Sequence, residues 1–463
     1  MRLKGNGALG ALGLTVATLA LAALRASAGP EAAPSGDQVC TRGAVTRQGR
    51  AWVQFITCQA PAKEGGRLIL RADGGSVVFR PNPSGPFACI VRLAAYGDEA
   101  QARAMLSRYG LTVRSLGGAG IYLDGKFPYE RRHNFSLDVG FGIHAPERYN
   151  LDLETQGGGI DVAKLDGELR ATTAGGDIRA GDVTGPVRVR TAGGDIDLGN
   201  VGARADAETA GGHIRVGNVE GDANLSTSGG DIVVGLLQGA LRAETAGGSI
   251  YLRSASGPVV AQTAGGQIQL GECGNTVDAE TAAGSIRLDG ARGMVRAQTA
   301  GGSLDLLELQ SAVRAETAAG RILAQLAAGR DSFAASELQS AVGDVMVYVP
   351  VNLPLTIDAD IDESAGHKIF SDFPLNVQGV EGFGSGSVRA RGALLGGGQL
   401  LRLHTQMGNI EIKKLDEQAR KLVEEYQKTF LVRWQAQWNA HKVEPQQAPK
   451  SPGPDDDNQD DHQ

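Results

Sequence analysis

A threonine recurs every 18 residues through the middle of this 463-residue chain. The copies stand at positions 155, 173, 191, 209, 227, 245, 263, 281, 299 and 317, without an insertion between them. Glycine follows three residues after each threonine, and isoleucine, or leucine at position 304, follows five residues after it. A fixed period in this range is typical of a solenoid, in which each repeat packs only against its neighbours.

The repeat is a β structure. Apolar and polar residues alternate at Ile178 and Ala180 and again at Val187 and Val189, which is the two-residue period of a β-strand. Glycine pairs separate the runs, and 18 residues leave no room for a helix beside two strands. The sequence therefore predicts an all-β fold, a parallel β-helix or β-solenoid, with ten 18-residue coils over residues 155–326.

Alignment of the repeats predicts which side chains form the core. Counted from threonine, offsets 5, 7, 10, 14 and 16 are apolar almost throughout. The threonine itself then faces inward, where its hydroxyl is expected to bond the glycine corner. The predicted structural residues are Thr173, Gly176, Ile178, Thr191, Gly194, Ile196, Thr209, Gly212, Ile214, Thr245, Gly248 and Ile250.

The glycine three residues after threonine never varies within the array. The position before it, in contrast, is alanine at 283 and 319. Because a positive φ favours glycine over every other residue, we expect the invariant glycine to hold the positive-φ corner.

The outward positions are polar. Arginines at offset 15 and glutamates at offset 17, among them Glu208, Glu244, Glu280 and Glu316, indicate a solvated face whose exposed ion pairs contribute little stability. A second row at offset 4 comprises Asp177, Asp195, His213 and Asp231. This row allows two interpretations, a metal or sugar site or an ordinary polar corner.

The N-terminus has the pattern of an export signal. Arg2 and Lys4 precede an apolar stretch over residues 8–24, and small residues follow at 26–28, as a signal peptidase requires. Residues 1–28 are therefore predicted to be a signal peptide; the alternative is an uncleaved N-terminal membrane anchor. No other stretch is apolar enough to cross a bilayer, so no transmembrane segment is expected after signal removal.

The flanks of the array divide by composition and period. We predict an N-terminal extension over residues 29–64, an N-terminal cap region over 65–154, and an irregular solenoid continuation with a C-terminal cap over 327–413. An amphipathic helix is predicted over 414–442 and a disordered acidic tail over 443–463.

Over residues 415–441 apolar residues recur at steps of three and four, which predicts a helix with one apolar face. Its members are Leu415, Ala419, Leu422, Tyr426, Phe430, Trp434 and Trp438. Two interpretations stay open: the helix caps the end of the solenoid, or it docks a partner or a membrane surface.

The chain has four cysteines. Cys40 and Cys58 are the candidate disulfide pair, closing a short loop near the mature N-terminus, as an exported protein permits. Cys273 occupies offset 10, where other coils have Val, Leu or Ala, so we expect a buried and unpaired thiol. Cys89 is expected to be unpaired as well.

The T-A-G-G-x-I-x-L array resembles the bacterial β-strand-repeat family catalogued as a "putative adhesin" domain of unknown function. The segment around Asp98, the run APERYNLDLETQGGGIDV (145–162), and the stretch from SDFPL to TQMGNIEI (371–412) are also similar to it. The resemblance covers residues 65–413. It implies a β-helix of the cell envelope.

No catalytic constellation is present in the sequence, and no cofactor or metal site is predicted. Nucleic acid is excluded as a partner, because no basic stripe tracks along the chain. The sequence favours an exported, non-enzymatic, adhesin-like envelope protein that presents a rigid surface to an unknown protein or glycan. The alternatives are an envelope-stress or signalling accessory protein and a polysaccharide-active β-helix enzyme. The expected location is the periplasm, the cell surface or the extracellular space.

Overall fold

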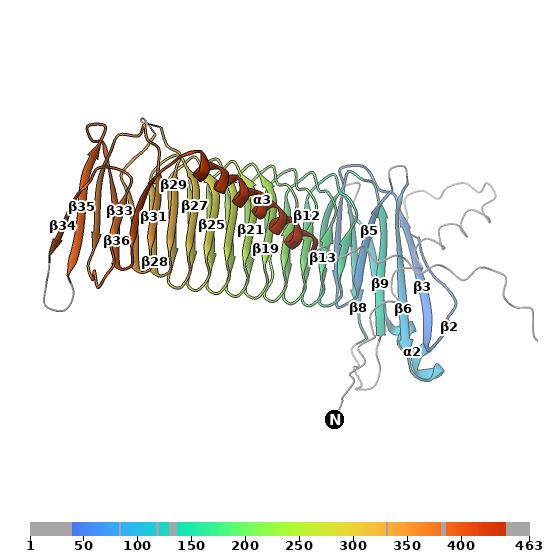
Figure 1. The fold of residues 1–463 in the computed structure, drawn as a ribbon. Helices are drawn as coiled ribbons and strands as arrows, with labels where there is room; N and C mark the ends of the chain where they lie inside the picture. The colour runs from blue at the N-terminus through green and yellow to red at the C-terminus, as the bar shows by residue number, and fades with distance from the viewer. Residues whose placement is uncertain are drawn as a thin grey trace, which may run out of the picture.

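The computed structural model describes residues 39–82, 85–116, 120–128, 137–329, 332–380 and 386–440. The predicted signal peptide and the acidic tail lie outside these residues. The chain forms a 19-stranded sheet, here called sheet A, and an 18-stranded sheet, here called sheet B. Their strands stack side by side into a long rod (Figure 1). The fold is thus mostly β, with two long stacks of parallel strands, and is compatible with a solenoid.

The regular part of the rod alternates between the two sheets. Its strands in sheet A are β11 (Ile160–Val162), β13 (Ile178–Ala180), β15 (Ile196–Leu198), β17 (Ile214–Val216), β19 (Ile232–Leu237), β21 (Ile250–Ala255), β23 (Ile268–Cys273), β25 (Ile286–Ala291), β27 (Leu304–Leu309) and β29 (Ile322–Leu326). Those in sheet B are β10 (Asn150–Thr155), β12 (Leu169–Thr173), β14 (Val187–Thr191), β16 (Ala205–Glu208), β18 (Ala223–Thr227), β20 (Leu241–Thr245), β22 (Val259–Thr263), β24 (Val277–Thr281), β26 (Val295–Thr299) and β28 (Val313–Ala319).

Each strand pairs in parallel with the strand one repeat further along the chain. In sheet B Thr245 aligns with Thr263, and in sheet A Ile250 aligns with Ile268. The same register runs from the β10–β12 pair to the β26–β28 pair. Equivalent side chains of successive repeats therefore lie above one another, and a residue type that recurs in the sequence becomes a continuous row along the rod.

The apolar rows face inward and form the core. Alternate residues of each strand are buried, as Ile250 and Leu252 are in sheet A and Ala243 is in sheet B, all with no exposed surface. These side chains join one cluster that extends from Ile56 to Ile412. The period-two alternation thus places one face of each strand in the core.

The N-terminal end of the rod is built out of chain order. Its elements are β1 (Val39–Arg42), β2 (Thr46–Gln48), β3 (Ala51–Ala60), β4 (Arg67–Ala72), β5 (Ser76–Pro81), β6 (Phe87–Tyr96), α2 (Glu99–Arg108), β7 (Gly110–Ser115), β8 (Gly120–Lys126) and β9 (Leu137–Ala145). The β4–β5 pair lies between β8–β9 and β10–β11, in parallel with both. Antiparallel pairing of β3 with β6, β6 with β9 and β7 with β8 then ends the parallel stack.

The C-terminal end of the rod is also built out of chain order. Its strands are β30 (Ser336–Val342), β31 (Val345–Val349), β32 (Leu355–Ile361), β33 (Ile369–Ser371), β34 (Asn376–Val380), β35 (Ser387–Leu394), β36 (Gln399–Met407) and β37 (Ile410–Lys414). The β36–β37 pair lies between β30–β31 and β32–β33. Antiparallel pairing of β35 with β32 and β34 then ends sheet B. Antiparallel strands thus cover the parallel edge of both sheets at the N-terminal end and of sheet B at the C-terminal end, whereas sheet A ends in β33, which pairs in parallel with β37.

The C-terminal segment forms α3 (Glu417–Ala440), which crosses the stacked strands obliquely (Figure 1). It contacts β21, β23 and β25 of sheet A, and its Phe430 and Trp434 are buried, at 2% and 6% exposed. Of the two interpretations of this helix, the one in which it caps the end of the solenoid is wrong. The helix packs instead on the side of the rod, against apolar residues on the outer face of sheet A.

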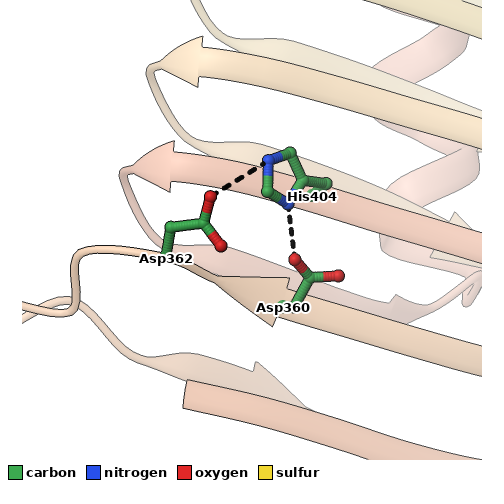
Figure 2. A group of neighbouring side chains, drawn as sticks. All are labelled: Asp360, Asp362 and His404. Atoms are coloured by element: carbon green, nitrogen blue, oxygen red, sulfur yellow. Dashed lines mark hydrogen bonds and ion pairs between the residues drawn. The ribbon is translucent and has the colours of Figure 1, made fainter. Parts of the chain in front are cut away.

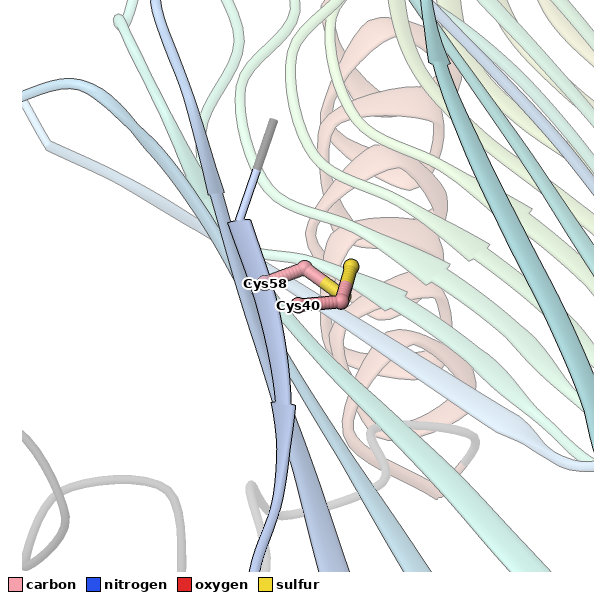
Figure 3. Close-up of a disulfide and its surroundings, with 2 residues drawn as sticks. All are labelled: Cys40 and Cys58. Carbon is pink, nitrogen blue, oxygen red and sulfur yellow. A yellow bond between two sulfur atoms is a disulfide. The ribbon is translucent and has the colours of Figure 1, made fainter. Parts of the chain in front are cut away.

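One disulfide joins β1 to β3 at the N-terminal end of the rod. Cys40 of β1 stands opposite Cys58 of β3 in antiparallel register, and their sulfur atoms are bonded (Figure 3). Cys89 and Cys273 are free, as predicted, and both are buried, as expected of Cys273. Burial raises the pKa of the Cys273 thiol to about 12, so this residue serves the core as a small apolar side chain.

Candidate functional site

The predicted threonines and glycines meet at one corner of every coil. Each threonine is buried, and its hydroxyl donates to the carbonyl oxygen of the glycine at offset 3 of the preceding coil. The distances from Oγ1 are 2.9 Å for Thr173 to Gly158, 2.8 Å for Thr191 to Gly176, 2.9 Å for Thr209 to Gly194 and 2.9 Å for Thr245 to Gly230. The isoleucines at offset 5 begin the sheet A strands, and all are in the core. These residues therefore build the scaffold, and of this set Thr245 also lines the groove described below.

The reason for the invariant glycine differs from the one expected. Of the ten glycines at offset 3, only Gly158 has a φ in the left-handed region, at 102°. A Cβ on Gly248 would instead lie 2.0 Å from the carbonyl oxygen of Gly230 on the coil below, whereas a Cβ on Gly247 would lie 3.5 Å from its nearest atom. Stacking of the corners, and not positive φ, requires glycine in the central coils.

The row at offset 4 is an ordinary polar corner. Asp177 accepts a hydrogen bond from the backbone amide of Asp195 at 3.0 Å, and Asp195 accepts one from the amide of His213 at 2.8 Å. The Nδ1 atom of His213 accepts from the amide of Asp231 at 2.9 Å. Each side chain thus satisfies the backbone of the next coil, and this interpretation is favoured over a metal or sugar site.

A second row, on the outer face of sheet B, has a different character. At offset 17 successive coils carry Glu244, Gln262, Glu280, Gln298 and Glu316, and register continues the row to Gln339 of β30. We call these six residues the Glu–Gln ladder. The amide of Gln262 donates to Glu280 at 3.3 Å, and the amide of Gln298 donates to Glu316 at 3.1 Å.

The Glu–Gln ladder is one wall of a groove of about 920 Å³ along the rod. The remaining lining residues are small: the threonines of the corner, Ser226, and the alanines that follow each threonine, from Ala246 to Ala318, together with Ala341. The lining carries three carboxylates and no lysine, arginine or histidine, and Arg242, outside the lining, forms an ion pair with Glu244. Adjacent strands are about 4.8 Å apart, so the carboxylates of alternate coils recur about every 9.6 Å.

The row extends beyond the groove into the C-terminal cap. Gln339 aligns with His404 of β36, and His404 aligns with Asp360 of β32. There the glutamate and glutamine side chains give way to a histidine placed between Asp360 and Asp362 (Figure 2). Nothing in the sequence places these residues together, because the chain inserts β36 between β30 and β32.

The outer face of sheet A is covered by α3. Val233 and Tyr251 pack with Phe430 and Trp434 in one cluster, and the indole nitrogen of Trp434 donates to the carbonyl oxygen of Val234 at 3.1 Å. Arg253 lies over the ring of Trp434, with 5.4 Å from its guanidinium carbon to the ring centroid. The sequence held a signal for this contact: Val233 and Tyr251 are the neighbouring apolar residues at offset 6, an otherwise mostly polar position.

Among the solved structures that the chain resembles, three are described as adhesion proteins. A "putative cell adhesion protein" from Clostridium sporogenes ATCC 15579 matches 82% of this chain and 100% of its own, at 9% identity and a TM-score of 0.14. A "putative adhesin" from Bacteroides fragilis NCTC 9343 matches 78% of this chain and 97% of its own, at 11% identity and a TM-score of 0.21. A "putative adhesin" from Parabacteroides distasonis ATCC 8503 matches 68% of this chain and 95% of its own, at 10% identity and a TM-score of 0.22.

No family model and no curated protein matches the chain. Likenesses at these identities and TM-scores carry no argument about function, which therefore rests on the residues of this chain. Among the described residues, neither helix is long and apolar enough to traverse a membrane.

Proposed function

We propose that the chain is an exported, non-enzymatic, adhesin-like protein of the cell envelope that binds an extended partner along the Glu–Gln ladder. The observation that carries the proposal is the groove of about 920 Å³, whose lining has three carboxylates and no cationic side chain. A chain with spaced positive charges complements such a surface, and complementary charge speeds encounter and selects the partner.

The proposed architecture serves this role. Ten 18-residue coils over residues 155–326 form a rigid rod, the regions 65–154 and 327–413 cap it, and residues 29–64 extend the N-terminal cap. Because the coils stack in register, the rod presents equivalent positions at a fixed spacing, with a glutamate of the ladder in every second coil. Export of the chain rests on the sequence pattern of residues 1–28.

The spacing of the carboxylates in the Glu–Gln ladder defines the peptide that should bind to it. Carboxylates recur about every 9.6 Å along the groove, and a polyproline II peptide repeats one face every three residues, about 9.3 Å. A peptide with the repeat Lys-Pro-Pro should therefore place one ammonium group at each carboxylate. A peptide of equal length and charge, with its lysines clustered at one end, is the matched control.

Binding of the two peptides by the full chain, measured by fluorescence anisotropy at several salt concentrations, tests the proposal. We expect tighter binding of the regularly spaced peptide, and weakening with salt. The triple variant Glu244→Gln, Glu280→Gln, Glu316→Gln should lose this binding.

The control variant Glu99→Gln, Glu147→Gln, Glu417→Gln changes charge equally, at exposed ion pairs outside the groove, and should bind as the wild type does. Equal loss in both variants would show that net charge, and not the ladder, attracts the peptide.

A further inference from the structure

The cluster at the end of the ladder row follows from strand register. His404 of β36 stands directly opposite Asp360 of β32 in a parallel pair. Asp362 lies two residues beyond Asp360, so its side chain falls on the same face. Its backbone amide donates to the carbonyl oxygen of Thr405 at 3.1 Å, which holds it beside His404. Two segments about 40 residues apart in the chain thus bring one imidazole between two carboxylates.

The two ring nitrogens of His404 have different surroundings (Figure 2). Nδ1 lies 2.5 Å from a carboxylate oxygen of Asp360, in hydrogen-bond contact, and both side chains are largely shielded, at 18% exposed. Nε2 lies 3.7 Å from a carboxylate oxygen of Asp362, whose side chain is 58% exposed. The second distance is too long for a hydrogen bond, and the gap opens to solvent.

This arrangement has the chemistry of a metal site. A histidine that binds a metal through one nitrogen usually donates its other ring N–H to a carboxylate, which fixes the tautomer and the ring orientation. Zinc lies about 2.0–2.2 Å from nitrogen and carboxylate oxygen ligands. Two such ligands separated by 3.7 Å therefore leave room for one ion between them at a wide angle.

We propose that Nε2 of His404 and a carboxylate oxygen of Asp362 bind a divalent transition-metal ion, with Asp360 as the positioning residue. Imidazole and carboxylate ligands suit zinc, and water from the open side completes its coordination. Arg389 of β35 stands opposite Asp360. Its ion pair is with Asp358, however, with 3.9 Å from the guanidinium Nε to a carboxylate oxygen. A bound ion would join β32 to β36 and so fasten the strand pair inserted in the C-terminal cap.

The test is calorimetric titration of Zn²⁺ into the metal-free full chain and four variants. Because the chain has seven histidines, the difference between variants identifies the site. His404→Gln and Asp362→Asn should each lose one equivalent of zinc. Asp360→Asn should retain the site and bind about 10–100-fold more weakly, as loss of a carboxylate partner of a ligating histidine does. His213→Gln, another histidine beside an aspartate, should bind as the wild type does.

A second measurement separates metal binding from a folding defect. Unfolding in the presence of a chelator should show His404→Gln folded, and zinc should raise the unfolding midpoint of the wild type but not of this variant, since a ligand stabilises only the state that binds it. Unchanged zinc stoichiometry in His404→Gln or in Asp362→Asn would overturn the proposal. The cluster would then serve only as a hydrogen-bonded contact between β32 and β36.

Discussion

The hydroxyl of Thr245 donates a hydrogen bond to the carbonyl oxygen of Gly230, on the preceding coil, at 2.9 Å. The same hydroxyl accepts from the backbone amide of Gly248 at 3.2 Å. One buried side chain thus satisfies two backbone groups at the corner, where the strand ladders are interrupted. Both bonds of this bridge recur in other coils, for example at Thr191 and Thr299, and the donated bond alone continues at Ser340 and Thr405 in the C-terminal part of the rod.

Thr245→Val keeps the shape of the side chain and removes the bridge. Both partners would then be buried without a hydrogen bond, and each such group costs about 1–3 kcal/mol. We expect the free energy of unfolding to fall by about 2–4 kcal/mol, measured by urea denaturation. Thr245→Ser keeps the hydroxyl and should lose about 1 kcal/mol, because only a methyl group is removed. A loss in Thr245→Val no larger than that in Thr245→Ser would show that the bridge contributes no more than one buried methyl group.

Gly248→Ala and Gly247→Ala form a matched pair. A Cβ at Gly248 would lie 2.0 Å from the Gly230 carbonyl oxygen, which is backbone and has no rotamer to change, whereas at Gly247 the nearest atom is 3.5 Å away. Overpacking of this kind costs about 1–3 kcal/mol or more. We expect a clear loss of thermal stability for Gly248→Ala and little change for Gly247→Ala. Similar unfolding temperatures for the two would contradict the stacking explanation.

Trp434→Ala should release α3 from sheet A. The indole is buried, its nitrogen donates to the Val234 carbonyl oxygen, and truncation of a buried tryptophan costs about 3–5 kcal/mol. Hydrogen exchange over residues 417–440 should rise strongly, while exchange in β22 and β24 on sheet B stays slow. Val432→Ala, at a position 70% exposed, should leave exchange unchanged. Slow exchange of α3 in the tryptophan variant would show that other contacts hold the helix.

The sequence predicts the regular part of this fold well, because each coil repeats the environment of the last. One alignment of the repeats identifies residues such as Ile250 and Cys273 as buried, and both are. The identity of a residue does not reveal why it is required, however. Position 248 requires glycine because a Cβ there would meet the carbonyl oxygen of Gly230. That oxygen belongs to the neighbouring coil, so the sequence of one repeat does not reveal the requirement.

The ends of the rod and the candidate site lie beyond sequence reasoning for a topological reason. The chain inserts β4–β5 and β36–β37 out of order, so neighbours such as His404 and Asp360 follow no period. The glutamates of the ladder are visible in the sequence as a polar face. Only the stack shows that alternating glutamines and a row of alanines turn that face into a groove.

Burial of Asp289 gives the stability of the chain a pH dependence. The residue is 3% exposed on the outer face of sheet A, in a pocket that Arg420 and Glu424 of α3 also line. Burial raises the pKa of its carboxyl group to about 6, although Arg287, at 3.0 Å, opposes the rise. The unfolded value is about 3.9. The folded state therefore binds more protons than the unfolded state between these values, and stability falls as pH rises through them.

Asp289→Asn should remove this dependence of the free energy of unfolding on pH. A shift of about two pKa units corresponds to a loss on the order of 2–3 kcal/mol between pH 4 and pH 7, measured as the difference between wild type and variant in urea midpoints at each pH. Asp206→Asn is the control of opposite sign. Burial raises the pKa of Asp206, but hydrogen bonds from Arg204 and Arg188 outweigh burial and lower it, so that residue contributes stability that is lost as pH falls. A wild-type slope retained in Asp289→Asn would show that other groups produce it and that Asp289 does not contribute.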